Sequence, residues 1–348
     1  CISQDRSAVK DITDSLAAYK DIVDRAISPE KIDKYLRFFT AEPHVASTPR
    51  NNDLAKFIVD EWKSYGLEDV RISEYDVLLS FPEKISVEMV SPKKYVLKLA
   101  EAPYPQDPDT QKDVGIPYNA YSCSGDITAP VVYANNGNPQ DFDYLEKKGV
   151  KLQGKIALVR YSMPYSYRGF KALTAERRGL AGLLIFSDPK DDGSACGPVF
   201  PDGPWGPLSH IQRGGIPFDF ISPGDPLTPG WASTPGCRRI SPEKAQTLPK
   251  LISVPISAED ALPLFEGMGG ENALEEWPGA LPVTYRLGGE TPVVHIAIKM
   301  DNSIKMISDV IGCIKGTDGT DDLVLVGNHR DAWVFGGVDP SSGTATLM

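Results

Sequence analysis

The sequence lacks any continuous apolar run of the roughly 20 residues that a membrane-spanning helix needs. It also lacks a dense run of lysine and arginine, and its formal net charge is -11. An acidic chain without a basic patch is a poor partner for nucleic acid or an anionic membrane surface, so we exclude both as main partners. There is no Asn-x-Ser/Thr sequence, so glycosylation gives no indication of the compartment.

Cysteine is scarce, with 5 residues in 348, and no two cysteines have the C-x-x-C spacing of a zinc knuckle. Because the count is odd, at least one thiol stays unpaired. Cys196 and Cys237 both lie in loops rich in glycine and proline, and they could form a disulfide in an oxidising compartment or remain free. Cys313 lies in an apolar stretch and is predicted to be a buried strand residue.

What is present is typical of a globular protein. Hydrophobic residues make up 41% of the chain and charged residues 24%, and the length is sufficient for two domains. Apolar residues at helical spacing predict a helix over residues 8–26. A Ser-Pro-Glu start predicts a capped helix over 28–40, and a third helix is expected over 52–65, ended by Gly66. Residues 69–79 alternate between apolar and polar types, as a strand does.

From about residue 81 the chain changes to short strands, turns and prolines. This β-rich region is interpreted as a domain inserted into the first. Its expected strands are residues 85–90, 94–99, 130–133, 155–160 and 182–188, with a helix over 169–178, a strand and helix within 252–268, and two further strands within 283–299. An interior strand is expected near residues 304–314, where the chain returns to the first domain.

Residues 323–326 are a run of branched apolar residues, which predicts a strand buried on both faces. This strand would bring His329 and Asp331 to its carboxyl end, where open α/β sheets keep their sites. Asp339 follows a pair of glycines that let the chain turn back, so His329 and Asp339 could meet at one metal. An imidazole nitrogen and a carboxylate oxygen suit zinc. Asp331 would accept the other ring N–H of His329 and fix the orientation of the ring.

Spacing alone also fits a capped turn that binds no metal. The longer phrase His-Arg-Asp-Ala-Trp-Val-Phe-Gly-Gly-Val-Asp-Pro-Ser-Ser-Gly at residues 329–343 resembles the first metal-ligand segment of the glutamate carboxypeptidase II (prostate-specific membrane antigen) and transferrin receptor family. Residues 43–49 resemble a turn at the edge of that family's catalytic domain, which favours a structural role for His44. Residues 154–188 resemble the family's protease-associated domain. The resemblance runs from about residue 28 to Met348.

The resemblance implies an α/β fold. A zinc-exopeptidase-like mixed sheet with helices on both faces, incomplete in this chain, would carry an inserted β-rich α+β protease-associated domain. The expected division is a helical stalk-like lead-in at 1–27, a first part of the catalytic domain at 28–83, the protease-associated domain at 84–303, and the metal-strand part of the catalytic domain at 304–348.

The resemblance also implies a co-catalytic di-zinc metallo-exopeptidase that hydrolyses peptide bonds with a hydroxide bridging the two metals. Asp339 would bridge the zinc ions and His329 would bind one of them. The other ligands and the general base are expected beyond Met348, so this piece alone should be inactive. The alternative is a non-catalytic receptor or trafficking adaptor of the same fold, as in the transferrin receptor branch.

Substrate and partner expectations come from the same resemblance. Arg168 matches an arginine that holds a substrate carboxylate, whereas Trp205 stands where glutamate-selective members have an asparagine. An acidic terminal residue should therefore be accepted without being required. The backbone carbonyls of Thr228 and Trp231 match a calcium loop. A homodimer is expected, on the extracellular or lumenal face of a membrane, with an anchor upstream of Cys1.

Overall fold

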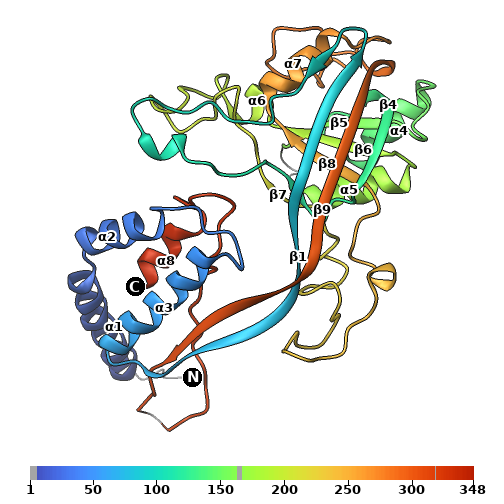
Figure 1. Cartoon of the computed structure of the whole chain (residues 1–348). Helices are drawn as coiled ribbons and strands as arrows, with labels where there is room; N and C mark the ends of the chain where they lie inside the picture. Colours follow the sequence, from blue (N-terminus) through green and yellow to red (C-terminus); the bar gives the residue numbers. More distant parts are fainter. Residues whose placement is uncertain (1–5, 163–166, 318) are drawn as a thin grey trace, which may run out of the picture. The chain divides into compact units, whose positions relative to one another are not determined.

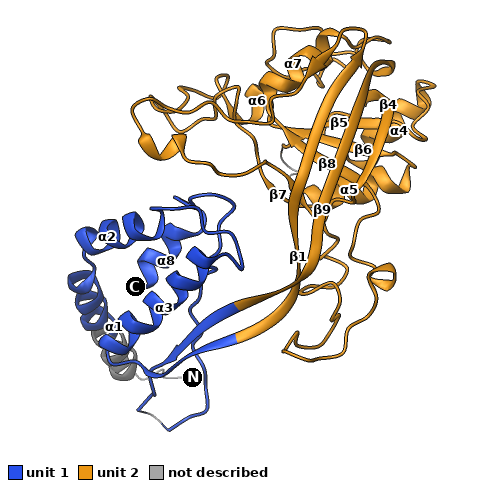
Figure 2. Ribbon diagram, viewed as in Figure 1, with its two compact units in different colours: residues 1–73, 308–348 blue, residues 74–307 orange. Residues whose placement is uncertain are grey.

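The computed structural model describes residues 6–162, 167–317 and 319–348 and divides the chain into two compact units (Figure 2). Unit 1 comprises residues 1–73 and 308–348, and unit 2 comprises residues 74–307. Both borders fall inside long strands, β1 (Glu68–Ser91) and β9 (Gly288–Cys313), which run from one unit into the other. The first five residues of the expected lead-in, which include Cys1, lie outside the described residues.

Unit 1 contains the helices α1 (Arg6–Ala26), α2 (Pro29–Phe39), α3 (Pro49–Ser64) and α8 (Ser341–Leu347) (Figure 1). The hydroxyl of Ser28 accepts a hydrogen bond from the backbone N–H of Lys31 at 3.2 Å, and Thr48 caps α3 in the same way. Gly66 has a φ of 86°, which lets the chain leave α3 sharply. The first three helices confirm the sequence prediction. The core of this unit is Tyr35, Phe39, Leu54, Ile58 and Ala345.

A seven-stranded mixed sheet has the order β2-β1-β9-β4-β5-β6-β8. Strands β4, β5, β6 and β8 are parallel to one another, whereas β9 is antiparallel to β4 and β2 to β1. The bounds of the strands not yet given are β2 Tyr95–Val96, β4 Gly125–Tyr133, β5 Ile156–Arg160, β6 Gly182–Phe186 and β8 Ile252–Ile256. A separate two-stranded parallel sheet pairs β3 (Asn119–Ala120) with β7 (Gly214–Gly215).

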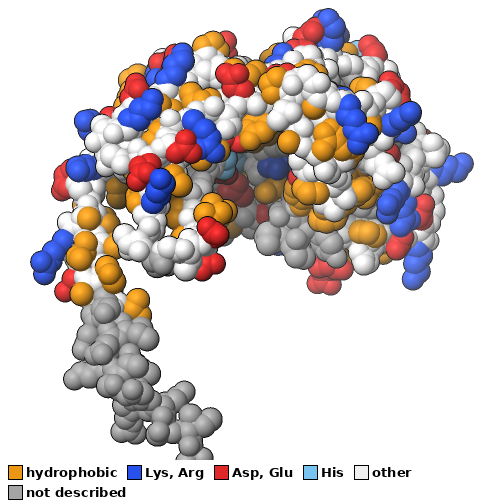
Figure 3. Space-filling view, turned by 90° about the horizontal axis from the view of Figure 1, so that it is seen from below, with side chains coloured by type: hydrophobic (Ala, Val, Ile, Leu, Met, Phe, Trp, Pro, Cys, Tyr) orange, Lys and Arg blue, Asp and Glu red, His pale blue; other side chains and the backbone are white. Residues whose placement is uncertain are grey.

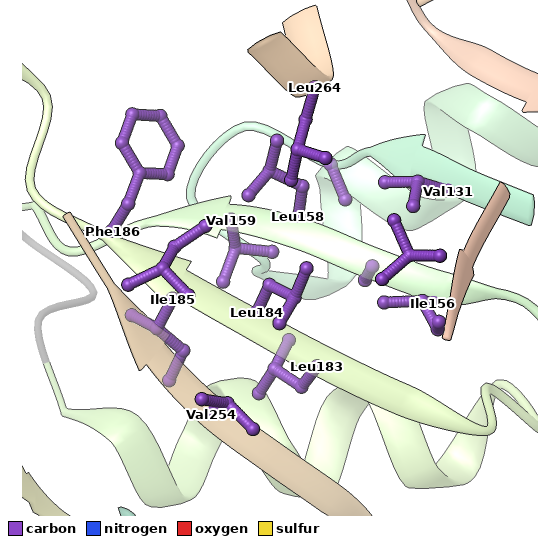
Figure 4. Packing of buried hydrophobic residues seen from close by; sticks show 14 of the residues in the cluster. Val131, Ile156, Leu158, Val159, Leu183, Leu184, Ile185, Phe186, Val254 and Leu264 are labelled. Atoms are coloured by element: carbon purple, nitrogen blue, oxygen red, sulfur yellow. The ribbon is translucent and has the colours of Figure 1, made fainter. Parts of the chain in front are cut away.

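Helices follow each of the parallel strands in the chain. They are α4 (Pro139–Lys147), α5 (Arg168–Arg177), α6 (Pro189–Asp192) and α7 (Ala258–Glu266), with short 3-10 helices at Pro108–Gln111 and Pro242–Lys244. Leu158 is paired with Leu184, so their side chains share one face of the sheet, the face on which Leu264 of α7 lies (Figure 4). Helix α5 lies on the opposite face (Figure 4). Every residue of β5, β6 and β8 is buried, which places the core of unit 2 around these strands.

The long strands differ from the sequence prediction in their continuity. The expected strands at 69–79 and 85–90 are parts of the single strand β1, and β9 joins the regions expected at 283–299 and 304–314. The strand expected at 94–99 is reduced to the two residues of β2. The alternation of apolar and polar residues could not reveal this continuity. A strand paired with a neighbouring strand can continue through polar residues that, in the sequence, resemble a turn.

The prediction of a buried strand at residues 323–326 is wrong. These residues have no regular secondary structure, and their side chains are between 74% and 93% exposed. A strand needs hydrogen-bonding neighbours for its backbone, and the described residues contain no strand that pairs with this run.

The cysteine predictions also need correction. Cys313, the last residue of β9, is exposed rather than buried, because the strand ends there. Cys196 and Cys237 are both free thiols, so the alternative without a disulfide describes this structure.

Among the described parts of the chain, no helix has the length and apolar character needed to cross a membrane. On the face shown in Figure 3, Lys and Arg side chains are mixed with Asp and Glu side chains.

Candidate metal centre

The structure brings His329 and Asp339 together. Nε2 of His329 lies 2.9 Å from Oδ1 of Asp339, although 10 residues separate them in the sequence. Both side chains are more than half exposed, at 55% and 83%. They lie in an irregular loop that precedes α8, so the loop, and not a strand, positions them.

Hydrogen bonds from Asn328 close this loop. Its side-chain amide donates to the carbonyl oxygen of Pro340 and to the hydroxyl oxygen of Thr344, both at 2.8 Å, and to the carbonyl oxygen of His329 at 3.0 Å. The Thr344 hydroxyl also donates to the carbonyl oxygen of His329, at 3.2 Å. The backbone on either side of the His329–Asp339 pair is therefore tied to the start of α8.

Arg330 anchors the loop to the rest of unit 1. Its Nε donates to the carbonyl oxygen of Asn51 at 3.1 Å and its Nη2 to the side-chain oxygen of the same residue at 3.1 Å. Nη2 also contacts the carbonyl and hydroxyl oxygens of Ser308, at 2.8 and 3.1 Å. Burial lowers the pKa of Arg330 from its usual value, yet a guanidinium with this many acceptors stays charged. A half-buried cation held by several acceptors fixes the backbone next to His329.

His44 holds the same loop through hydrogen bonds of its backbone. Its backbone N–H donates to the carbonyl oxygen of Val334, and its own carbonyl oxygen accepts from the N–H of Ala332, both at 3.2 Å. The amide of Asn51 also donates to the His44 carbonyl oxygen, at 3.2 Å. The ring is fully buried, and burial lowers its pKa, so it is neutral at pH 7. These contacts are those of a structural residue.

Asp331 contacts the ring of His329 mainly through its backbone. Nδ1 of His329 lies 3.0 Å from the carbonyl oxygen of Asp331 and 3.4 Å from its carboxylate. A carbonyl oxygen can only accept, so this contact places the proton of a neutral His329 on Nδ1. The sequence analysis predicts that the side-chain carboxylate of Asp331 makes this contact with the His329 ring.

This proton position tests whether a cation fits between His329 and Asp339. With Nδ1 donating to Asp331, a neutral His329 presents the lone pair of Nε2 to a carboxylate. Two acceptors 2.9 Å apart repel each other unless a proton or a cation lies between them. Zinc, which binds imidazole nitrogen and carboxylate oxygen, fits this pair of ligands. Within the described ranges no group of three or more His, Cys, Asp or Glu side chains could hold a metal, so His329 and Asp339 do not form a complete metal site by themselves.

A second His–Asp pair shows why the distance alone is not sufficient. Nε2 of His295, on β9, lies 2.9 Å from Oδ1 of Asp126 on β4, the same separation as in the loop. The described contacts give the His295 ring no second hydrogen-bond partner, so its Nε2 is free to carry the proton and donate. The two pairs differ in the contact made by Nδ1.

Arg168, the predicted substrate ligand, is the first residue of α5 in unit 2. Its Nε donates to the side-chain oxygen of Gln212 at 2.9 Å, its Nη2 donates to the carbonyl oxygen of Arg213, and its guanidinium lies 4.8 Å from the centre of the Tyr161 ring. Burial lowers its pKa. No carboxylate in the described residues forms an ion pair with this guanidinium. The charge is therefore partly desolvated and lacks a counter-ion, the state expected of an anion-binding arginine.

The predicted calcium loop is held together by its own hydrogen bonds. The backbone N–H of Trp231 donates to the carbonyl oxygen of Thr228 at 3.2 Å, which uses one lone pair of that expected ligand. Asp225 accepts from the Thr228 hydroxyl at 3.0 Å and from the N–H of Leu78 at 2.7 Å. Trp205 lies in another loop, where its carbonyl oxygen accepts from Phe200 at 2.9 Å.

The sequence analysis missed the residues that hold the loop of His329 and Asp339. Arg330 and Asn328 flank His329 and could have been noticed as polar neighbours of a candidate ligand. Asn51 lies 279 residues from Arg330, and no feature of its own segment indicates the contact. Its position inside α3 is typical of any polar helix residue.

Comparison with known proteins gives consistent similarities. A family model described as the PA domain matches residues 127–222. The chain is 37% identical to the aminopeptidase NAALADL1 of Rattus norvegicus, covering 98% of this chain and 48% of that protein. It is also 37% identical to the glutamate carboxypeptidase 2 homolog of Caenorhabditis briggsae, covering 92% of this chain and 43% of that protein. The chain thus spans about half the length of these relatives.

A solved structure supports the fold class. The peptidase M28 precursor of Shewanella amazonensis SB2B has a TM-score of 0.54 and 17% identity, covering 96% of this chain and 62% of that one. The α/β fold with a mixed sheet and a protease-associated domain is confirmed. Over nearly its whole length the chain is therefore a homologue of proteins named glutamate carboxypeptidase 2 homolog and aminopeptidase NAALADL1, and it contains a PA domain.

Proposed function

We propose that this chain is the amino-terminal portion of a zinc exopeptidase with a co-catalytic pair of zinc ions, and that His329 and Asp339 are its first two metal ligands. The observation that carries the proposal is the close approach of Nε2 of His329 to Oδ1 of Asp339, 2.9 Å apart, with Nδ1 of the same ring on the Asp331 carbonyl oxygen. The relatives named aminopeptidase and glutamate carboxypeptidase support the class of activity.

The residues of this chain would bind and orient. The carbonyl oxygen of Asp331 holds the His329 ring with Nε2 toward Asp339, and Arg330 and Asn328 hold the backbone, so both ligands are placed before a metal arrives. Zinc, when bound, would polarise the scissile carbonyl of a peptide. We propose that the other ligands and the general base lie in a further part of this protein, which corresponds to the portion of the longer relatives that residues 1–348 do not span. We also propose that residues 1–348 alone are inactive.

We further propose that Arg168 binds a carboxylate of the peptide substrate. Its guanidinium is held by Gln212 and the Arg213 carbonyl and lacks a counter-ion in the described part of the chain. A substrate carboxylate would supply that counter-ion. With Trp205 in place of an amide, an acidic terminal residue would be accepted without being required. Calcium at Thr228 and Trp231, a homodimer, and an extracellular or lumenal location are proposals that rest on the family resemblance.

The test uses the full-length protein and measures zinc content together with hydrolysis of peptides. His329→Ala and Asp339→Ala should each lower the zinc content and bring hydrolysis to background while the protein remains folded. Asp331→Ala should cost less, about 10- to 100-fold, because the nearest contact to the ring comes from its backbone.

The matched control is His295→Ala, which removes a His–Asp pair of the same separation and should change neither readout. An unchanged zinc content in Asp339→Ala protein would contradict the proposed ligand role. A wild-type protein that holds no zinc and hydrolyses no peptide would favour the receptor-like alternative.

A further inference from the structure

Unit 2 has a groove on its surface that is lined by aromatic and basic side chains. It lies between the start of α4 and one side of α5 and has a volume of about 560 Å³. Its walls include the aromatic side chains of Tyr167, Phe170 and Phe220. Arg168, the proposed substrate ligand, is not among its described lining residues, so this is a different site on the unit.

Two of the groove's aromatic rings are exposed and stacked on each other. The ring centres of Phe170 and Phe220 are 4.2 Å apart with an interplanar angle of 23°, and the two side chains are 46% and 41% exposed. The ring of Tyr167 meets Phe170 edge-on at 5.5 Å. Large aromatic side chains exposed next to a groove are a feature of binding sites, because a ligand that buries them gains hydrophobic stabilisation.

The charge of the groove is opposite to that of the chain. The chain has a net charge of -11, yet the described lining holds Lys171 and Arg177 and no aspartate or glutamate. Lys171 is buried and donates to the carbonyl oxygen of Asn136, and burial lowers its pKa to about 7, so it adds little positive charge to the groove surface. Arg177 is exposed, and no acidic partner for it occurs in the described residues. Asp219, outside the described lining, accepts a hydrogen bond from the Tyr167 hydroxyl, and Arg177 is the exposed cation of the described lining.

We propose that this groove is a peptide-binding site, and that it takes a segment in which a large apolar side chain stands next to an aspartate or glutamate. The apolar side chain packs on the Phe170–Phe220 stack, and the neighbouring carboxylate pairs with Arg177. A volume of about 560 Å³ holds one or two large side chains rather than a folded domain. One exposed cation is too few for a nucleic acid backbone or an anionic membrane, each of which is recognised by several.

The test measures the binding of a fluorescein-labelled hexapeptide with a central Phe-Asp pair to the full-length protein by fluorescence anisotropy. The peptide is acetylated and amidated, so it has no free terminus for an exopeptidase to act on. We expect Phe170→Ala and Phe220→Ala each to weaken binding by about 10-fold or more, since truncation of central aromatic contacts has effects of this size. Arg177→Gln should weaken binding of the Phe-Asp peptide by about 3- to 10-fold and leave a Phe-Asn peptide unaffected.

Matched controls separate this site from the metal centre. Phe200→Ala removes an aromatic residue of similar exposure outside the groove, and Lys151→Gln removes another exposed cation, and neither should change binding. Binding should also persist in His329→Ala protein, so failure of the proposed peptidase activity would not affect it. Absence of binding by the wild-type protein, or equal binding by the Phe170→Ala variant, would overturn the proposal, as would equal affinity for Phe-Asp and Phe-Lys peptides.

Discussion

Two runs of branched apolar residues in this molecule lie in opposite environments. In β6, Gly182–Phe186, every residue is buried and the strand is paired on both sides, with β5 and with β8. At residues 323–326 the side chains are mostly exposed and the backbone has no strand partner among the described residues. Each run contains two leucines and at least one β-branched residue, so this apolar character does not separate them. The presence or absence of neighbouring strands does.

The candidate metal loop, residues 328–340, follows the exposed run and is nevertheless well held. Arg330 fixes it to Asn51 and Ser308, Asn328 ties it to Pro340 and Thr344, and the backbone of His44 pairs with Ala332 and Val334. The strand was expected to deliver His329 to the site. In the structure, side-chain hydrogen bonds do so instead. The placement of His329 and Asp339 in this structure therefore does not need a strand at residues 323–326.

The largest effect we expect is the contrast between two leucine truncations. Leu184→Ala removes a fully buried side chain of β6 and should lower the free energy of unfolding by about 2–5 kcal/mol. Leu325→Ala removes a side chain that is 87% exposed and should change it by less than about 0.5 kcal/mol. Urea denaturation of residues 1–348 measures both. Equal losses would show that the 323–326 run is buried in solution.

The next effect concerns the anchor of the metal loop. Arg330→Met keeps the side-chain length but removes the hydrogen bonds to Asn51 and Ser308, a loss of about 1.5–3 kcal/mol. Hydrogen exchange of the amides of His44 and Ala332, which join the loop to its support, should become faster. In the full-length protein we expect zinc affinity to fall by about 10- to 100-fold. Lys315→Met, at a side chain 81% exposed, is the control. Unchanged exchange in Arg330→Met would mean that another contact holds the loop.

A smaller effect is the loss of stability of unit 2, which contains the buried strand β6, when Glu101 is protonated in acid. Burial raises the pKa of Glu101, but His210, Arg213 and the Ile211 backbone N–H outweigh it and lower the pKa from 4.5 to about 2. A carboxyl group with a lowered pKa stabilises the fold above pH 4.5, and that contribution is lost as the pH falls toward 2. Because the side chain is 30% exposed, we expect about 1–2 kcal/mol.

Glu101→Gln should remove this part of the pH dependence. Urea denaturation at several pH values between 2 and 7 would show a flatter profile for the variant than for the wild type. Identical profiles would mean that Glu101 is not ionised against Arg213 in the folded state.

Local patterns predicted the parts of the fold that depend on local chemistry. The Ser28 cap and the following proline located α2, and the apolar runs of β5 and β6 were located to within about two residues. The His329–Asp339 pairing was predicted from spacing and resemblance, and the structure brings the two side chains together. What could not be predicted depends on distant partners: the continuity of β9, the irregular backbone of residues 323–326, and the contact of Arg330 with Asn51.

The most direct test of the proposed metal centre is a crystal structure of the full-length protein with anomalous diffraction measured on both sides of the zinc absorption edge. We predict an anomalous peak between Nε2 of His329 and Oδ1 of Asp339, within bonding distance of both, with Nδ1 of His329 still facing the Asp331 carbonyl oxygen. Zinc-free density with a direct hydrogen bond between His329 and Asp339, in crystals grown with zinc present, would contradict the account.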